Sequence, residues 1–202
     1  MLTYQKNRNS LRALVGTAVL SALSFVLMLL EFSVPFVPAF LKLDFSDLPA
    51  LIASFAYGPL AGVTVALIKN LLHLPIGLPV TYGAGELANF LLCVSFVLPA
   101  GIFYRLVKGK TGAVIGALIG MMTMAIVGLP INYYITYPIY ATLMPMQEIL
   151  NAYTAINPAV TDLWSALVTI NLPFNLVKGL LSVVITFALY KKISPLLVGV
   201  KS

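Results

Sequence analysis

Hydrophobic positions in this chain fall in long continuous runs, without the alternation of apolar and polar residues that marks a half-buried strand. Runs of roughly 20 apolar residues are long enough for a helix to cross a bilayer core of about 30 Å. A strand of a membrane β-barrel would instead alternate over about ten residues. The pattern therefore predicts an all-α integral membrane protein.

Turn-forming residues divide the apolar runs into helices. Ser46 or Asp47 stands where an N-cap is favoured and Pro49 follows in the first turn, while Gly58–Pro59 is a strong turn signal. We therefore predict a single membrane domain over residues 1–202 with six transmembrane helices, at about 11–32, 47–57, 59–74, 86–107, 111–134 and 164–191.

Composition agrees with a membrane protein, and the placement of charge adds an orientation. The chain is 60% hydrophobic and 9% charged, whereas soluble domains carry about 25% charged residues. Six helices place both termini on one side, which collects most of the 12 Lys and Arg residues: Lys6, Arg8, Arg12, Arg105, Lys108, Lys110, Lys191, Lys192 and Lys201. Because basic residues favour the cytoplasmic side, we predict cytoplasmic termini in a multi-pass membrane protein.

The net charge of +6 does not indicate nucleic acid, because the basic residues stand at helix ends and not along one solvated face. The outer side holds the long connections 33–46, 75–85 and 144–163. It also holds every acidic residue, namely Glu31, Asp44, Asp47, Glu86, Glu148 and Asp162. We expect function at this outer face, where irregular backbone and polar side chains gather.

Three polar residues share one face of the last predicted helix. Asn171, Asn175 and Lys178 are spaced i, i+4 and i+7, and a lysine facing lipid near the bilayer centre costs about 2.5–3.5 kcal/mol on insertion scales. We therefore expect this face to turn toward a polar cavity, with Pro173 freeing a backbone carbonyl nearby. The alternative is that Lys178 reaches the outer interface while the asparagines join helices.

Polar residues and glycines near the outer ends of other helices are further candidates. Asn132 is as well suited to a helix end as to ligand contact. Gly83 and Gly85 let backbone approach a ligand closely. Glu86 either joins that site or stabilises a helix N-terminus, and Asn89, one turn deeper, is either structural or pocket-lining.

Aromatic residues near the outer connections supply walls for a flat apolar ligand. Together with the few amides, they favour a neutral, planar, hydrogen-bonding molecule. The aromatic candidates are Phe36, Phe40, Phe45, Tyr82 and Tyr133.

The sequence lacks the residues that ATP hydrolysis, metal binding or Cys–His catalysis would require. The chain has no Walker A loop, so an ATPase would have to be another protein. With one histidine, His73, and one cysteine, Cys93, the chain is poorly suited to a His-rich metal site or a Cys–His dyad. We predict no metal, no cofactor and no enzymatic activity, and we interpret His73 as an interfacial residue.

One block of the sequence carries a family resemblance. The stretch "FLKLDFSDLPALIASFAYGPLAGVTVALIKNLLH", from Phe40 to His73, resembles the riboflavin-specific substrate-binding S component of energy-coupling factor (ECF) transporters. The motifs "GELANF", "LPINYY" and "NLPFNLVKG" reinforce it, and the length and six-helix layout agree across nearly the whole chain.

The resemblance implies a six-helix fold that binds riboflavin at the extracellular side, in a complex with a membrane coupling protein and two cytosolic ATPases. It implies flavin contacts from Asn132, Asn175 and Lys178. It also implies that the first outer loop lines or covers the site, through Leu41, Lys42, Leu43, Asp44 and Phe45. Ala18 and Ala22, spaced small-xxx-small on the first helix, are then the surface that contacts the coupling protein.

Two other classes of function remain as alternatives. A self-sufficient facilitator or ion-coupled carrier often shows repeated halves with broken helices, and no such repeat is evident here. An intramembrane enzyme needs a nucleophile, a metal or an acid–base pair, for which Asn and Lys are poor candidates.

Overall fold

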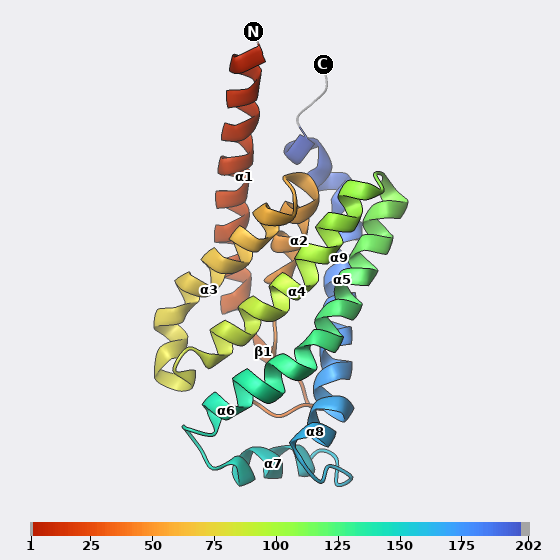
Figure 1. Cartoon of the computed structure of the whole chain (residues 1–202). Coiled ribbons are helices and arrows are strands. Elements are labelled where there is room, and N and C mark those ends of the chain that lie inside the picture. The colour runs from red at the N-terminus through yellow and green to blue at the C-terminus, as the bar shows by residue number, and fades with distance from the viewer. Residues whose placement is uncertain (1, 199–202) are drawn as a thin grey trace.

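The computed structural model describes residues 2–198, which form an elongated bundle of helices (Figure 1). The long helices are α1 (Leu2–Leu29), α3 (Pro59–Thr81), α4 (Ala84–Leu106), α5 (Lys110–Ile131) and α9 (Leu172–Val198). The shorter helices are α2 (Asp47–Ala56), α6 (Tyr137–Tyr140), α7 (Met146–Thr154) and α8 (Leu163–Ala166). Two five-residue π-helices, η1 (Asn132–Thr136) and η2 (Leu167–Asn171), follow α5 and α8. A small antiparallel ribbon pairs β1 (Phe32–Ser33) with β2 (Lys42–Leu43).

Within the described residues, five helical segments are long and apolar enough to cross a membrane: Ser10–Leu29, Pro59–Leu78, Ala84–Leu106, Lys110–Tyr140 and Leu163–Leu189. The helix α2 has 10 residues, about 15 Å at 1.5 Å per residue, which is half of a bilayer core. Its residues from Asp47 to Phe55 are all buried, and it packs among α1, α3, α4 and α9. The all-helical membrane architecture is thus as predicted, and α2 is an internal helix.

The connection between α3 and α4 differs from the predicted outer loop at 75–85. The helix α3 continues through Pro75 and ends at Thr81. Proline is tolerated inside membrane helices because neighbouring groups satisfy the freed backbone. Tyr82 and Gly83 then form the whole turn, both with positive φ, 48° and 83°. Gly83 is suited to this left-handed conformation, and α4 begins at the next residue.

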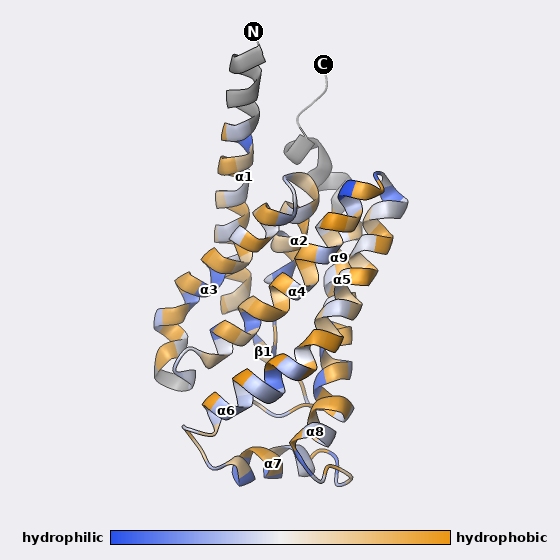
Figure 2. Cartoon of the chain, in the orientation of Figure 1, coloured by the Kyte–Doolittle hydropathy of each residue, from blue (hydrophilic) through white to orange (hydrophobic). Residues whose placement is uncertain are grey.

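The two ends of the molecule differ in character. The start of α1, the end of α9 and the α2–α3 and α4–α5 turns lie at one end, and α6, α7 and α8 lie at the other (Figure 1). Hydrophilic residues gather at the α4–α5 turn, while hydrophobic residues dominate the helices between the ends (Figure 2). The predicted orientation drew on the charge of Lys201, which lies outside the described residues.

Apolar side chains from α2 and α4 form the core between the helices, with Ala50, Leu51, Phe96 and Val97 fully buried. Many other leucines and valines are exposed on the outer helix faces, for example Leu14 and Leu60. An apolar outer surface of this kind suits lipid, because lipid tails are as apolar as leucine.

Candidate ligand-binding site

A cavity of about 370 Å³ opens among α1, α3, α4, α5 and α9, within the size range of small-molecule sites. It is lined by 10 of the predicted ligand-contacting residues: Leu41, Lys42, Asp44, Gly85, Glu86, Asn89, Asn132, Asn171, Asn175 and Lys178. The structure therefore brings residues from distant parts of the chain to one place. Three predicted residues lie outside the cavity lining, namely Leu43, Phe45 and Gly83.

Each of these three exclusions has a local cause. Leu43 is the buried residue of β2, while Phe45 packs against the ring of Phe32 at 6.2 Å between centroids. Gly83 serves the tight α3–α4 turn, and its nearest neighbours are leucine side chains of α3.

The α9 side of the cavity carries the predicted polar stripe, and Asn171 at its outer end is held by two tyrosines. Tyr153 donates to Asn171 Oδ1 at 2.6 Å, and Asn171 Nδ2 donates to the Tyr137 hydroxyl at 3.1 Å. The two tyrosine hydroxyls also bond to each other. Asn171 thereby ties α7 and α6 to the end of η2, and most of its hydrogen-bonding capacity is already used.

Asn132 and Asn175 differ from Asn171, because no hydrogen bond reaches their side chains from the residues that the structure describes. Both are buried, at 6% and 5% exposure, and both line the cavity. Because both amides face the cavity without a protein partner among the described residues, their donors and acceptors are available to a ligand. Gly128 makes room for Asn175, since a Cβ at that position would lie 2.8 Å from Asn175 Nδ2.

A π-helical turn lies at or near each amide, because Asn132 belongs to η1 and Asn175 follows the end of η2 by four residues. Asn132 begins η1, between Pro130 and Pro138, and η2 ends two residues before Pro173. Proline clashes with the preceding turn of an α-helix, and a π-turn is one way to absorb the disturbance. Such single π-turns occur frequently at functional sites.

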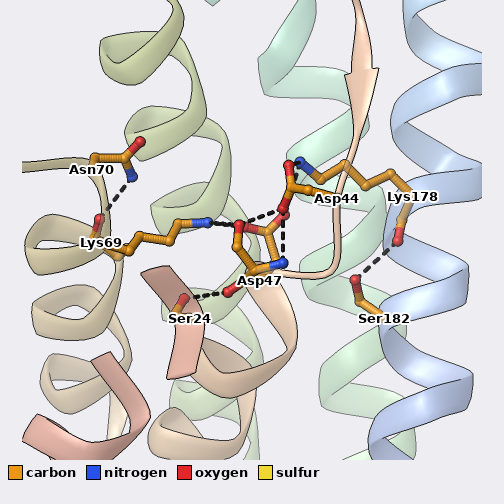
Figure 3. Close-up of polar contacts among 9 residues, drawn as sticks. Ser24, Asp44, Asp47, Lys69, Asn70, Lys178 and Ser182 are labelled. Carbon is orange, nitrogen blue, oxygen red and sulfur yellow. Dashed lines mark hydrogen bonds and ion pairs between the residues drawn. The ribbon is translucent and has the colours of Figure 1, made fainter. Parts of the chain in front are cut away.

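Lys178 reaches the cavity wall and forms an ion pair there with the first outer loop. Its Nζ lies 2.9 Å from Asp44 Oδ2 and 3.6 Å from Asp47 Oδ2, as Figure 3 shows for the Asp44 contact. The lysine side chain is 10% exposed, so it neither faces lipid nor reaches the outer interface. An ammonium group has three donors, and those that Asp44 does not occupy are available to a ligand.

A second lysine supports the same two aspartates from inside the bundle. Lys69 Nζ donates to Asp47 Oδ1 and to Ser46 Oγ, both at 2.6 Å, and its side chain is fully buried. Ser46 also donates to Asp44 and accepts a bond from Ser24 of α1 at its backbone carbonyl. The charges of Asp44, Asp47, Lys69 and Lys178 thus balance in one network that joins α1, α2, α3, α9 and the first outer loop.

The ionisation of Asp44 follows from this network. Burial opposes the charged carboxylate, but the nearby Lys178 and Lys69 outweigh that effect and lower the pKa of Asp44 below its ordinary 3.8. The hydrogen bond from Ser46 acts in the same direction. Asp44 is therefore an anion at neutral pH, and it holds Lys178 at the cavity.

The opposite side of the cavity, between α3 and α4, is built around Glu86. His73 Nδ1 lies 2.8 Å from Glu86 Oε1, and Thr81 donates to Oε2 at 3.2 Å. His73 is buried, so its interpretation as an interfacial residue is wrong: the α3–α4 packing brings it against a carboxylate. One turn further along α4, the Oδ1 atom of Asn89 is buried and has no hydrogen-bond partner among the described residues.

Aromatic side chains line the cavity from the first outer loop, α6 and α9, namely Phe40, Tyr137, Tyr140 and Phe174. Phe40 lines the cavity and packs edge-on against Tyr153 at 5.8 Å and Tyr140 at 6.3 Å between ring centroids. The other predicted aromatic walls are wrong, because Phe36 and Tyr82 are 79% and 71% exposed, and neither Phe45 nor Tyr133 lines the cavity.

Ala18 and Ala22 lie on α1, away from this site. Both are exposed, whereas Thr17, Ser21 and Ser24 of the same helix are buried in the bundle. The two alanines therefore belong to a free face of α1 and do not line the cavity.

Sequence reasoning missed several residues that complete the site, above all Asp47, His73 and Tyr137, which line the cavity, and Lys69 behind it. A signal was present in α3, since Lys69 and His73 are spaced i, i+4 in an apolar helix. The cost that directed attention to the α9 stripe applies equally to this pair. In the described residues, no group of three or more His, Cys, Asp or Glu side chains is placed to hold a metal ion.

Comparisons with known proteins agree along almost the whole chain. Residues 12–190 match the family model described as ECF transporter, substrate-specific component. The chain is 35% identical over 195 residues to the riboflavin transporter RibU of Staphylococcus aureus (strain TCH60), covering 96% of this chain and 94% of that protein. It is 36% identical over 191 residues to the riboflavin transporter FmnP of Bacillus subtilis (strain 168), covering 91% and 93%. A solved structure of the S component of a bacterial ECF transporter superposes with a TM-score of 0.73 at 32% identity, covering 93% of this chain and 98% of that one.

Proposed function

The chain belongs to the family of ECF transporter substrate-specific components, and from this premise we propose that it is the riboflavin-binding subunit of an ECF-type vitamin importer in the cell membrane. The observation that carries the proposal is the cavity itself. The buried residues Asn132 and Asn175, whose amides bond to none of the described residues, line it beside the ammonium group of Lys178. Relatives of the chain are named as riboflavin transporters.

The chemistry of riboflavin fits these groups. Its isoalloxazine ring is planar and uncharged, with apolar faces and one edge that carries carbonyl oxygens and an N–H. An asparagine amide offers both donors and an acceptor, so Asn132 and Asn175 are suited to that edge, and Lys178 donates to a ring oxygen. Phe40 and the apolar residues of the lining, such as Leu92 and Met124, cover the ring faces.

The remaining polar groups of the cavity have separate roles in this proposal. Leu41, Lys42 and Asp44 bring the first outer loop against the bound vitamin, with Asp44 positioning Lys178. Gly85, Glu86 and Asn89 lie on the α3–α4 side, where they face the hydroxylated ribityl chain. Asn171 acts through Tyr137 and Tyr153 and shapes the wall. Riboflavin is here a transported substrate, and no cofactor or metal is proposed.

The membrane arrangement follows from the family premise and the charge pattern. We place both termini in the cytoplasm and the cavity toward the exterior, in the six-helix S-component fold in which α2 counts as the short second helix. The chain contains no Walker A loop, so transport energy comes from two cytosolic ATPases through a membrane coupling protein. The exposed face of α1 around Ala18 and Ala22 is the proposed contact with that coupling protein, because small residues allow close helix approach.

The function is tested directly by the absorption spectrum of the purified protein and by riboflavin titration. We expect a yellow preparation with a flavin spectrum and saturable quenching of flavin fluorescence at one ligand per chain. A colourless protein that does not quench added riboflavin would contradict the proposal. Riboflavin uptake by vesicles that contain this chain alone would instead identify a self-sufficient carrier.

The coupling surface has its own test. Replacing Ala18 or Ala22 by Leu should leave riboflavin binding unchanged and reduce both transport and co-purification of the ATPase complex, since the bulkier side chain prevents close helix contact. The matched control is Val19→Leu on the same exposed helix surface. Normal co-purification of the complex with Ala18→Leu would remove this face from the interface.

A further inference from the structure

A groove of about 470 Å³ runs along the outer face of α5, apart from the ligand cavity. Its lining residues all belong to α5 and are spaced three and four positions apart, so they share one face of the helix. The hydroxyl of Thr123 donates to the backbone carbonyl of Ile119 at 2.9 Å or less, at 2.8 Å, and the groove therefore offers apolar contact along its length. The lining comprises Ile115, Leu118, Ile119, Met122, Thr123, Ile126 and Val127.

The helices beside α5 leave this face uncovered. The helix α4 packs against the glycine side of α5, where a Cβ at Gly116 would lie 2.7 Å from the backbone oxygen of Ala100. The helix α9 packs near Met121, whose Cγ would lie 2.7 Å from a Cβ at Gly179. On the grooved face, by contrast, Met122 is 47% exposed. Because α5 belongs to a segment long and apolar enough to cross a membrane, this face meets acyl chains.

The length and position of the groove suit one leaflet of a bilayer. From Ile115 to Val127 the helix rises about 18 Å, at 1.5 Å per residue, and half of a bilayer core is about 15 Å. The groove begins about 7.5 Å along the helix from Lys110, the first residue of α5. An acyl chain lying in the groove would therefore have its headgroup end at the α4–α5 turn.

That turn carries positive charges that the protein does not neutralise. Arg105, Lys108 and Lys110 are exposed, and no carboxylate of the described residues forms an ion pair with any of them. Lys108 Nζ lies 4.7 Å from the centre of the Tyr104 ring, a contact that leaves its charge in place. The helices α4 and α5 contain one acid, Glu86, at the opposite end of α4. A hydrophilic, basic turn thus adjoins the end of an apolar groove (Figure 2).

From this juxtaposition we propose that the α5 groove and the α4–α5 turn bind one anionic phospholipid, with an acyl chain along the groove and the phosphate at the turn. Lys and Arg form charge-assisted hydrogen bonds with phosphate, and anionic lipid attracts basic segments beside membrane helices. A zwitterionic lipid offers the same chains without net charge, and a soluble phosphate offers charge without chains. The site is separate from the cavity and does not depend on the proposed riboflavin function.

The first experiment compares two lipids on the unmodified, detergent-solubilised protein by native mass spectrometry. The lipids are phosphatidylglycerol and phosphatidylcholine with identical acyl chains. We expect one phosphatidylglycerol per chain, bound at least about tenfold more tightly than phosphatidylcholine, because each basic residue of the turn attracts the anionic headgroup. Glycerol 3-phosphate, the headgroup anion without acyl chains, should not displace the lipid. Equal binding of the two lipids, or displacement by glycerol 3-phosphate at the lipid's own concentration, overturns the proposal.

The second experiment removes charge from the turn with the double variant Lys108→Gln/Lys110→Gln. We expect the affinity ratio of phosphatidylglycerol to phosphatidylcholine to fall about fivefold or more. Because the readout is a ratio, a general loss of lipid affinity cancels. The matched control is Arg12→Gln, which removes an exposed charge of α1 at the same end of the molecule and should leave the ratio unchanged. An unchanged ratio in the double variant, or an equal fall in the control, contradicts the proposed site.

The third experiment fills the groove and leaves the turn intact. Ile119→Trp should weaken phosphatidylglycerol binding about fivefold, since the larger side chain occupies the space proposed for the acyl chain. Val184→Trp, at an exposed position of α9 outside the groove, is the control and should bind normally. Normal binding by Ile119→Trp, or an equal loss in Val184→Trp, would show that the lipid does not lie in the groove. If Ile119→Trp does not fold, the two-lipid comparison and the charge variants decide.

Discussion

The two lysines that hold Asp44 and Asp47 stand in regions of different character, one inside the α2–α3 interface and the other on the cavity wall. Lys69 is fully buried and has two acceptors at 2.6 Å. Lys178 is 10% exposed, and its carboxylate contacts are longer, at 2.9 Å and 3.6 Å. The comparison separates two uses of the same residue type: Lys69 completes a buried ion pair of the fold, whereas Lys178 keeps donors directed at the cavity.

The largest expected effect comes from breaking the inner pair. Lys69→Met leaves Lys178 to neutralise both Asp44 and Asp47, so one buried negative charge is in excess, and loss of one member of a buried ion pair typically costs about 3–5 kcal/mol. The measurement is the free energy of unfolding of the detergent-solubilised protein. The double variant Asp47→Asn/Lys69→Met removes both charges and should recover part of that loss. Wild-type stability in the single variant would show that Lys69 does not support the fold.

A smaller effect, on binding instead of stability, is expected at the cavity wall. Lys178→Ala should lower riboflavin affinity about 10- to 100-fold, the loss expected for a charge-assisted hydrogen bond of about 1.5–3 kcal/mol, without preventing membrane insertion. Fluorescence titration of purified protein measures it. Val177→Ala, at an exposed position of the same helix, is the control and should bind normally. Unchanged binding by the Lys178 variant would remove this residue from the site.

Asp44 connects the two regions, because it pairs with Lys178 at the cavity wall and bonds through Ser46 to the Lys69 side. Acidification tests this connection, which depends on the charge of Asp44. Its pKa is lowered in the folded protein, so the folded state binds this proton less tightly than the unfolded state does. The contribution of Asp44 to stability is therefore complete above the ordinary pKa of 3.8 and is lost as the pH falls below it.

We expect acidification from pH 5 to pH 3 to lower the free energy of unfolding through this group by at most about 1 kcal/mol, because the unfolded carboxyl group titrates at its ordinary pKa of 3.8. Thermal unfolding at a series of pH values provides the measurement. Asp44→Asn should lack this part of the pH dependence. Parallel profiles for the two proteins would mean that Asp44 is not the titrating link.

The smallest expected effect comes from moving one amide of the cavity. Gly128→Ala places a Cβ 2.8 Å from Asn175 Nδ2 and 2.9 Å from Leu92 Cδ2, so the Asn175 amide must shift. We expect riboflavin affinity to fall about 3- to 10-fold, corresponding to about 1 kcal/mol. Gly16→Ala is the control, because it displaces the Tyr57 ring and no cavity residue. If both variants bind equally well, the position of the Asn175 amide does not limit affinity.

The sequence alone predicted the cavity wall on α9 because lipid makes polar residues costly. A stripe of Asn171, Asn175 and Lys178 in an apolar helix has to face something other than acyl chains, and the structure places all three on the cavity. Spacing alone left Asn132 as well suited to a helix end as to ligand contact, and only the family resemblance assigned it to the site. That these groups contact a flavin stays a prediction.

Rules based on local sequence could not predict which residues pair with these polar groups. Asp44 and Lys178 are separated by 134 positions in the sequence, and no spacing rule indicates which acid approaches which base. The pairing of His73 with Glu86 depends on a turn of two residues, where the prolines at the end of α3 suggested a longer loop. The prediction failed there because a rule learned from water-exposed helices does not hold where neighbouring helices and lipid surround the backbone.

The order of the balanced charges along the chain bears on how this protein is made. Asp44, Asp47 and Lys69 enter the membrane with the first helices, whereas Lys178 belongs to the last one. Until α9 inserts, the half-assembled bundle therefore holds one carboxylate more than it can neutralise. An unmatched charge away from water is unfavourable, so the charge of Lys178 favours packing of the last long helix against the helices that precede it in the chain.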